Sequence, residues 1–266
     1  MAEYDTTDSE LSDAPEFSSH ERRSAGDFPF YRGSPVALSG AQWAVVLIGT
    51  AFGFAALTAP LEFYRTTAGG FLAVILFFAI PLAALGLVAG SGWTALFRKL
   101  VLRDVLWMIG VAVANLAVSV VIVLLVRNLF DMSANPVGGM LGEFSQSERA
   151  LFYLKTIPQL FGEEVVSILP FLAILWLCHT RLAIARKPAV IIAWLGAAVL
   201  FGAMHLPTYD WNAVQCFLVI GSARVMLLIG YIATKNILVS AGAHIINDWL
   251  IFTVIVLVLG QQTAAL

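Results

Sequence analysis

Charged residues are scarce in this chain, and their scarcity excludes the commonest class of protein. Asp, Glu, Lys and Arg together make up 12% of the 266 residues, whereas about a quarter is usual in soluble domains. Hydrophobic residues make up 60%. An ordinary soluble domain of this length is therefore excluded, and the long apolar runs predict a polytopic membrane protein. We expect a lipid bilayer around it and no nucleic-acid partner.

Cysteine is also rare. Cys178 and Cys216 are the two cysteines, the first in a loop and the second in an apolar run, and they do not form a C-x-x-C spacing. The sequence therefore predicts neither a disulfide framework nor a cysteine metal site. We expect both residues to act as small apolar side chains.

Large aliphatic residues are few in the first 40 positions, which are rich in Ser, Asp and Glu. Such a segment cannot bury enough apolar surface to offset the entropy that ordering would cost. We therefore predict a disordered acidic tail over residues 1–40 and one transmembrane domain over residues 41–260.

Seven apolar runs follow this tail, each near or above the length of about 20 residues that spans a bilayer. All are predicted to be helices, because an isolated strand cannot satisfy its backbone hydrogen bonds in lipid. The fold class is therefore all-α, a polytopic transmembrane helical bundle of 7–8 spans. The eighth span would arise if the last run broke near Gly242 or if the amphipathic residues 91–103 entered the interface. The runs cover residues 42–60, 68–90, 104–126, 151–177, 188–206, 213–234 and 237–259.

The loop charges predict an orientation, because Lys and Arg concentrate in cytoplasmic loops. Most cations between the runs fall on one side of the membrane, the side of the N-terminus. Three arginines fall on the other side. We therefore predict a cytoplasmic N-terminus. The first set is Arg22, Arg23, Arg32, Arg98, Lys99, Arg103, Arg181, Arg186, Lys187 and Lys235, and the second is Arg65, Arg127 and Arg149.

Two adjacent carboxylates, Glu163 and Glu164, stand in the middle of the run 151–177. A carboxylate at membrane depth costs about 2.5 kcal/mol or more and usually faces a protein interior or a water-filled cavity. Neighbouring residues on a helix point about 100° apart, so only one of the two can aim straight into a shared cavity. Arg224 is the only cation deep in a run, and we predict that it pairs with Glu164.

Two histidines and an aspartate complete the intramembrane polar set. His205 follows Phe201 by four residues and Asp248 follows His244 by four, so each pair shares a helix face. A desolvated Glu can act as a general base, and an imidazole can hold the same water or protonate a leaving amine. A second imidazole can donate to a developing oxyanion. The set Glu163, His205 and His244 could instead bind zinc with an open water position.

Three short motifs lie on three different apolar runs. Together, and in their order along the chain, they resemble the motifs of the CPBP family of intramembrane proteases (CAAX protease and bacteriocin-processing, also called ABI). The resemblance covers residues 151–259. It implies a helical fold of typically eight spans and a glutamate- or metal-dependent endopeptidase. It also implies a peptide or membrane-protein substrate and a bacterial plasma membrane. The motifs are Glu163-Glu164, Phe201-x-x-x-His205 and His244-x-x-x-Asp248.

The resemblance also implies roles for these residues. Glu163 and His205 would activate water, with Glu164 in support. His244 and Asp248 would hold the oxyanion side. Some members of the family depend on zinc, so the metal stays an open alternative.

Two positions depart from the family pattern. Ile168 stands where the family has Arg, which removes a cation near the glutamates that Arg224 could replace from another helix. Asp248 stands in place of Asn, so its role would be to orient His244. These departures leave a non-catalytic membrane adaptor with the same fold as the alternative. A proton-coupled transporter is a third hypothesis, but the sequence has no visible pair of repeated halves.

The depths of the two histidines conflict if the spans simply alternate. His205 then falls near the outer end of its helix, while His244 falls closer to the inner end of the last one. We therefore expect the last run to be broken or re-entrant, with residues 240–242 as its weak point.

Overall fold

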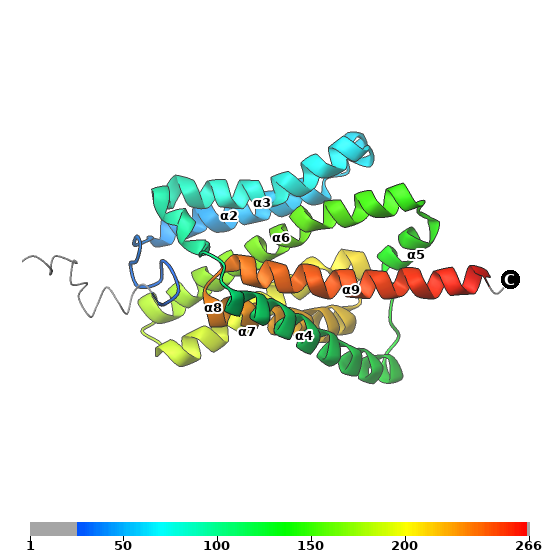
Figure 1. The fold of residues 1–266 in the computed structure, drawn as a ribbon. Helices are drawn as coiled ribbons and strands as arrows, with labels where there is room; N and C mark the ends of the chain where they lie inside the picture. Colours follow the sequence, from blue (N-terminus) through cyan, green and yellow to red (C-terminus); the bar gives the residue numbers. More distant parts are fainter. Residues whose placement is uncertain (1–25, 265–266) are drawn as a thin grey trace, which may run out of the picture.

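The structure is a computed structural model that describes residues 26–264, with side chains described up to residue 258, and within that part it contains helices and no strands. Figure 1 shows the helices packed as a bundle. The all-α prediction is thereby confirmed. The helices are α2 (Gly40–Thr58), α3 (Thr67–Ala89), α4 (Leu102–Leu129), α5 (Pro136–Glu143), α6 (Gln146–Trp176), α7 (Arg186–Met204), α8 (Gly221–Thr234) and α9 (Ile237–Ala264).

Seven helical segments of the described chain are long and apolar enough to cross a membrane, which confirms the lower of the two predicted numbers. A short 3₁₀ turn, Gly90–Leu96, continues α3 and does not form another span. Helix α5 has eight residues and is too short to cross. The segments are Gly40–Thr58, Thr67–Leu96, Leu102–Leu129, Gln146–Arg181, Arg186–Met204, Gln215–Thr234 and Ile237–Val258.

Helix α9 runs without interruption from Ile237 to Ala264. The expected break at residues 240–242 is therefore wrong. The hydroxyl of Ser240 finds its acceptors inside the bundle, at Glu164 and the carbonyl oxygen of Leu227, so this residue does not interrupt the helix. His244 reaches the polar residues of α6 from an ordinary helical turn.

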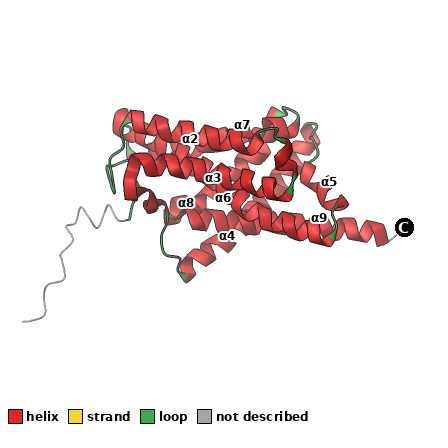
Figure 2. Ribbon diagram, turned by 90° about the horizontal axis from the view of Figure 1, so that it is seen from above, coloured by secondary structure: helices red, strands yellow, loops and turns green. Residues whose placement is uncertain are grey.

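Helix α6 is the centre of the bundle. In its most apolar stretch 72% of the residues are buried, against 22–44% in the other six spans. The α2–α3 pair packs on one side of it, and α7 and α9 pack on the other (Figures 1 and 2). Gly162 allows this approach, because a Cβ there would lie 2.4 Å from the Phe77 ring of α3. A polar side chain on α6 is therefore surrounded by protein on nearly every side.

The segment before α2 packs against the core. Phe28, Phe30 and Tyr31 are buried and belong to the same apolar cluster as α6. The prediction of disorder is therefore wrong for residues 26–39, because three aromatic side chains offset the cost of ordering this polar stretch. The rest of the predicted tail, residues 1–25, lies outside the described residues.

Asp27 fastens this segment to the ends of other helices. Its carboxylate accepts hydrogen bonds from Arg186 at 2.6 Å and from the hydroxyl of Tyr31 at 2.5 Å. Arg98 donates to its backbone oxygen at 3.2 Å. Burial alone would raise the pKa of Asp27, but these side-chain partners and the N–H of Phe28 lower it to about 2.

Three of the cations that were predicted to share one side of the membrane meet at one end of the bundle. Arg98 and Arg186 contact Asp27, and the ammonium of Lys235 lies 4.9 Å from the Phe28 ring centre. Three loops that are far apart in the chain therefore converge on one short segment.

Candidate functional site

The predicted ion pair between Arg224 and Glu164 is present and forms the base of the site. Arg224 comes from α8 and Glu164 from α6, and both side chains are fully buried. Two opposite charges in such surroundings stabilise each other only if their remaining hydrogen bonds are also made. The guanidinium lies over the Phe201 ring of α7, 3.7 Å from its centre. Helices α6, α7 and α8 are thus joined at one point.

Both carboxylate oxygens of Glu164 accept hydrogen bonds from protein donors. Oε1 accepts from Arg224 and from Nδ1 of His244, which lies 2.8 Å away, and Oε2 accepts from the hydroxyl of Ser240. Three donors from two other helices leave no room for a water molecule or a substrate. Glu164 therefore acts as an anchor for the surrounding groups.

Glu163 is the accessible member of the pair. Its Oε2 lies 3.7 Å from Nη2 of Arg224 and 3.8 Å from Nε2 of His244, and 14% of its side chain is exposed. Among the described residues no hydrogen bond to its carboxylate is made. Both distances exceed those of direct hydrogen bonds, so the carboxylate is held by charge while its oxygens stay free for water.

His244 connects the two glutamates with Asp248. A carboxylate can only accept, so the contact with Glu164 places a hydrogen on Nδ1 of His244. Nε2 then faces Glu163 at 3.8 Å and Asp248 at 3.7 Å. The i, i+4 spacing that predicted a shared face for His244 and Asp248 is the reason for this second contact.

His205 lies beside this cluster and outside its direct contacts. It caps the end of α7, where Nδ1 lies 2.9 Å from the carbonyl oxygen of Phe201 and the two rings lie 4.5 Å apart. Phe201 in turn carries the guanidinium of Arg224. Within the described part of the chain no carboxylate lies within 4.0 Å of His205. Because Nδ1 donates to the carbonyl, Nε2 is left as an acceptor.

Tyr209 is a residue of this region that the sequence reasoning missed. It follows His205 by one short 3₁₀ turn and is buried. Burial, together with the nearby charges of Cys216, Asp248 and Glu163, raises the pKa of Tyr209 to about 12. The phenol therefore keeps its proton at neutral pH. A Tyr four residues after a motif histidine was the available signal.

The residues proposed for zinc do not gather. No group of three or more His, Cys, Asp or Glu side chains suited to a metal ion forms among residues 26–264. His205 is the member that stays apart, since its near contacts are with Phe201. The set Glu163, His205 and His244 therefore does not fit a metal in this structure.

The cation missing at Ile168 is supplied from α8. Ile168 is fully buried in the apolar core, while Arg224 reaches both Glu163 and Glu164. One guanidinium can approach two carboxylates because its N–H groups point in fixed, diverging directions. Arg224 therefore provides, from another helix, the cation that Ile168 does not.

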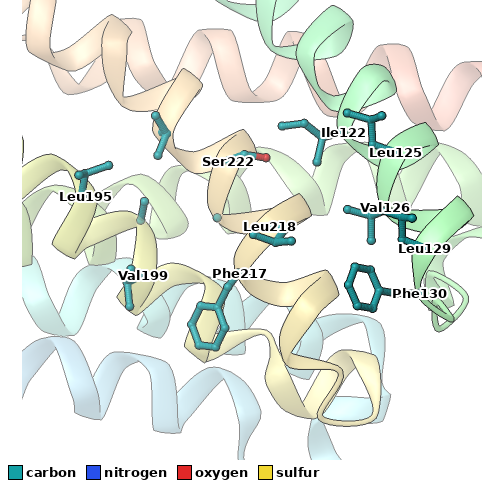
Figure 3. A pocket seen from close by; sticks show the side chains of 13 residues that line it. Ile122, Leu125, Val126, Leu129, Phe130, Leu195, Val199, Phe217, Leu218 and Ser222 are labelled. Carbon is teal, nitrogen blue, oxygen red and sulfur yellow. The ribbon is translucent and has the colours of Figure 1, made fainter.

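A second feature of the bundle is an apolar groove of about 620 Å³ between α4, α7 and α8 (Figure 3). Leu125 and Leu129 of α4 and Leu195 and Val199 of α7 lie along it. Ser222, the polar side chain of its lining, donates to the carbonyl oxygen of Val219, in the turn just before α8, at 2.9 Å. Helix α8 presents Ser222 to the groove and Arg224 to the cluster.

One comparison with known proteins gives a match. Residues 145–250 match the family described as Type II CAAX prenyl endopeptidase Rce1-like. This region runs from the start of α6 into α9 and contains every residue of the charged cluster. Neither a curated protein nor a solved structure matches the chain.

Proposed function

Since residues 145–250 match the family described as Type II CAAX prenyl endopeptidase Rce1-like, we propose that this integral membrane protein cleaves a peptide bond of a membrane-associated substrate. Glu163 is the general base in this proposal. The observation that carries it is the contrast between the two glutamates: Glu164 is filled by three donors, and Glu163 is partly exposed with none.

The reaction starts with a water molecule beside Glu163. The carboxylate takes one proton as the water oxygen bonds to the carbonyl carbon, and Nε2 of His205 accepts a hydrogen bond from the same water. When the C–N bond breaks, Glu163 returns its proton to the leaving amine.

His244 and Asp248 serve the oxyanion in this scheme. The cluster holds three carboxylates and one guanidinium: Arg224 contacts Glu163 and Glu164, and Asp248 lies beside Nε2 of His244. In this scheme a proton on Nε2 of His244 offsets part of the excess negative charge. That N–H can turn from Asp248 to an oxyanion as charge develops there. Asp248 accepts hydrogen bonds and holds the imidazole in position.

The apolar groove between α4, α7 and α8 favours a substrate that carries an apolar group. Its lining is almost wholly aliphatic and aromatic, and its volume lies in the range of roughly 300–1,000 Å³ that is usual for ligand sites. A lipid chain attached to the substrate could lie there while the peptide reaches the cluster past α8.

A cleavage assay with matched variants tests the proposal. The purified protein, in detergent, is given a quenched fluorescent peptide that carries a prenyl group near its C-terminus. We expect cleavage by the wild type and a loss of at least about 100-fold in Glu163→Gln, since a general base contributes roughly 10²–10⁴-fold. Glu62→Gln, at an exposed carboxylate remote from the cluster, is the control and should keep full activity.

The adaptor hypothesis makes the opposite prediction. It is favoured by the position of His205, which is not in contact with Glu163. If neither the wild type nor Glu163→Gln cuts the peptide, the peptidase proposal is wrong and the adaptor remains. If Glu163→Gln folds as well as the wild type and cuts as fast, Glu163 is not the general base.

A further inference from the structure

A buried chain of hydrogen bonds reaches the site from α4, a helix outside the region that matches the family. Nδ2 of Asn115 donates to Oδ1 of Asn247 at 3.1 Å, and Nδ2 of Asn247 donates to Oδ1 of Asp248 at 2.9 Å. Asn115 and Asn247 are 1% and 4% exposed. Two amides thus lie in the interior of a membrane bundle, where an unpaired polar group is costly.

The direction of this chain is fixed by its last member. A carboxylate oxygen only accepts, so Asn247 must turn its NH₂ group toward Asp248. Its carbonyl oxygen then faces α4, which requires the NH₂ group of Asn115. The carbonyl oxygen of Asn115 faces Ser119, whose hydroxyl donates across 3.4 Å. Every donor therefore points toward Asp248.

The contact has a consequence for the chemistry of Asp248. Oδ1 is the oxygen that accepts from Asn247, and the same oxygen lies 3.7 Å from Nε2 of His244. One N–H of Asn247 is committed to Asp248, and its carbonyl oxygen is committed to Asn115. Asp248 is therefore held beside Nε2 of His244 by an amide that is itself held from α4.

We infer that Asn115 and Asn247 are positioning residues, which hold Asp248 as an oriented acceptor beside His244. Helix α4 becomes part of the site through Asn115, although the charged residues of the cluster all lie on other helices. The catalytic meaning of this inference rests on the proposed function, but the hydrogen-bond chain itself can be tested without any substrate.

A polarity-reversal cycle tests the chain. Asn115→Asp places an acceptor at both ends of Asn247, so its carbonyl oxygen must face a carboxylate, and the melting temperature in detergent should fall by several degrees. In an Asp248→Asn background the chain can run in the opposite direction, because Asn at 248 can donate and the carboxylate at 115 accepts. In that background we expect Asn115→Asp to lower the melting temperature by less than half as much as it does in the wild type.

The cycle has its own control and its own contradiction. Ser119→Ala removes only the long 3.4 Å contact and should change the melting temperature little. If Asn115→Asp lowers the melting temperature equally in both backgrounds, positions 115 and 248 are not coupled, and the inference is wrong.

An activity measurement separates positioning from simple stability. With the prenylated peptide, Asn115→Leu should lower kcat by roughly tenfold, as is usual for residues that orient a reacting group, with KM within about twofold. Rates are expressed per folded protein from gel filtration. A loss explained wholly by less folded protein overturns the positioning role. If the wild type does not cut the peptide, the proposed function fails, while the polarity cycle still decides the hydrogen-bond chain.

Discussion

At the scale of single residues, the two adjacent glutamates have opposite environments. The 100° between neighbouring helix positions turns Glu164 into the contact with α8 and α9 and leaves Glu163 at the edge of the cluster. The same peptide segment thus provides an anchor with no free oxygen and a carboxylate that water can reach. Arg224 contacts both glutamates, and we expect its replacement to reduce the stability of the protein more than the replacement of any other residue of the cluster.

Arg224→Gln should destabilise the protein by about 3 kcal/mol or more, because removing one member of a buried ion pair leaves the other charge unpaired. The measurement is the yield of monodisperse protein and its melting temperature in detergent. The double variant Arg224→Gln with Glu164→Gln has no unpaired charge at Glu164 and should recover part of the loss. Unchanged folding of the single variant would contradict the importance of the pair.

At the scale of elements, the segment of residues 26–39 acts as a clasp on the end of the bundle. Its aromatic side chains enter the core, and Asp27 binds Arg186 of α7 and the loop residue Arg98. The carboxylate of Asp27 ties this segment to Arg186, and the backbone oxygen of Asp27 ties it to Arg98. The low pKa of the Asp27 carboxylate makes this clasp sensitive to acid.

The sign of that sensitivity follows from the pKa of Asp27. The value is about 2 in the folded protein and 3.8 as the reference, so the contribution to stability is present above pH 4 and is lost as the pH falls toward 2. Asp27→Asn should cost about 1 kcal/mol at pH 7, allowing for screening by water. The gap in melting temperature between this variant and the wild type should close between pH 4 and pH 2.

A matched variant separates Asp27 from its neighbourhood. Arg32 lies 3.8 Å from the same carboxylate and is 59% exposed, so Arg32→Gln should have little effect at any pH. A gap that stays constant from pH 7 to pH 2 would show that the ion pair with Arg186 is not what stabilises the clasp.

At the scale of the whole molecule, the ends of the bundle differ in charge. Arg98, Arg186 and Lys235 gather around residues 26–39 at one end, and His205 and Tyr209 lie at the far end of α7. Positive charge marks the cytoplasmic side, so we expect the N-terminal end to face the cytoplasm of a bacterial cell.

Single cysteines at the two ends test this orientation. Ala37 and Ser147 are both exposed, and Cys178 and Cys216 are replaced by Ala in the background. A membrane-impermeant maleimide should label Ser147→Cys in intact spheroplasts and Ala37→Cys only after lysis. The reverse pattern would invert the protein and place the charged end outside.

The sequence by itself determined the fold class, a bundle of seven to eight spans and the pairing of Arg224 with Glu164, and it named the charged residues of the candidate site. These follow from constraints that act locally or that lipid imposes everywhere: backbone groups must be paired within each span, and a buried cation needs an anion. Helical spacing also predicted that His244 and Asp248 share a face.

The tertiary structure alone decided which residues meet across helices. It brought Asn115 of α4 to Asn247, Ser240 to Glu164 and the aromatic residues of 26–39 to the core, and it left His205 on Phe201 rather than on Glu163. Such contacts depend on how α4, α6, α7 and α9 are rotated and shifted against each other. That arrangement is set by close packing of the whole bundle, and no short stretch of sequence contains it.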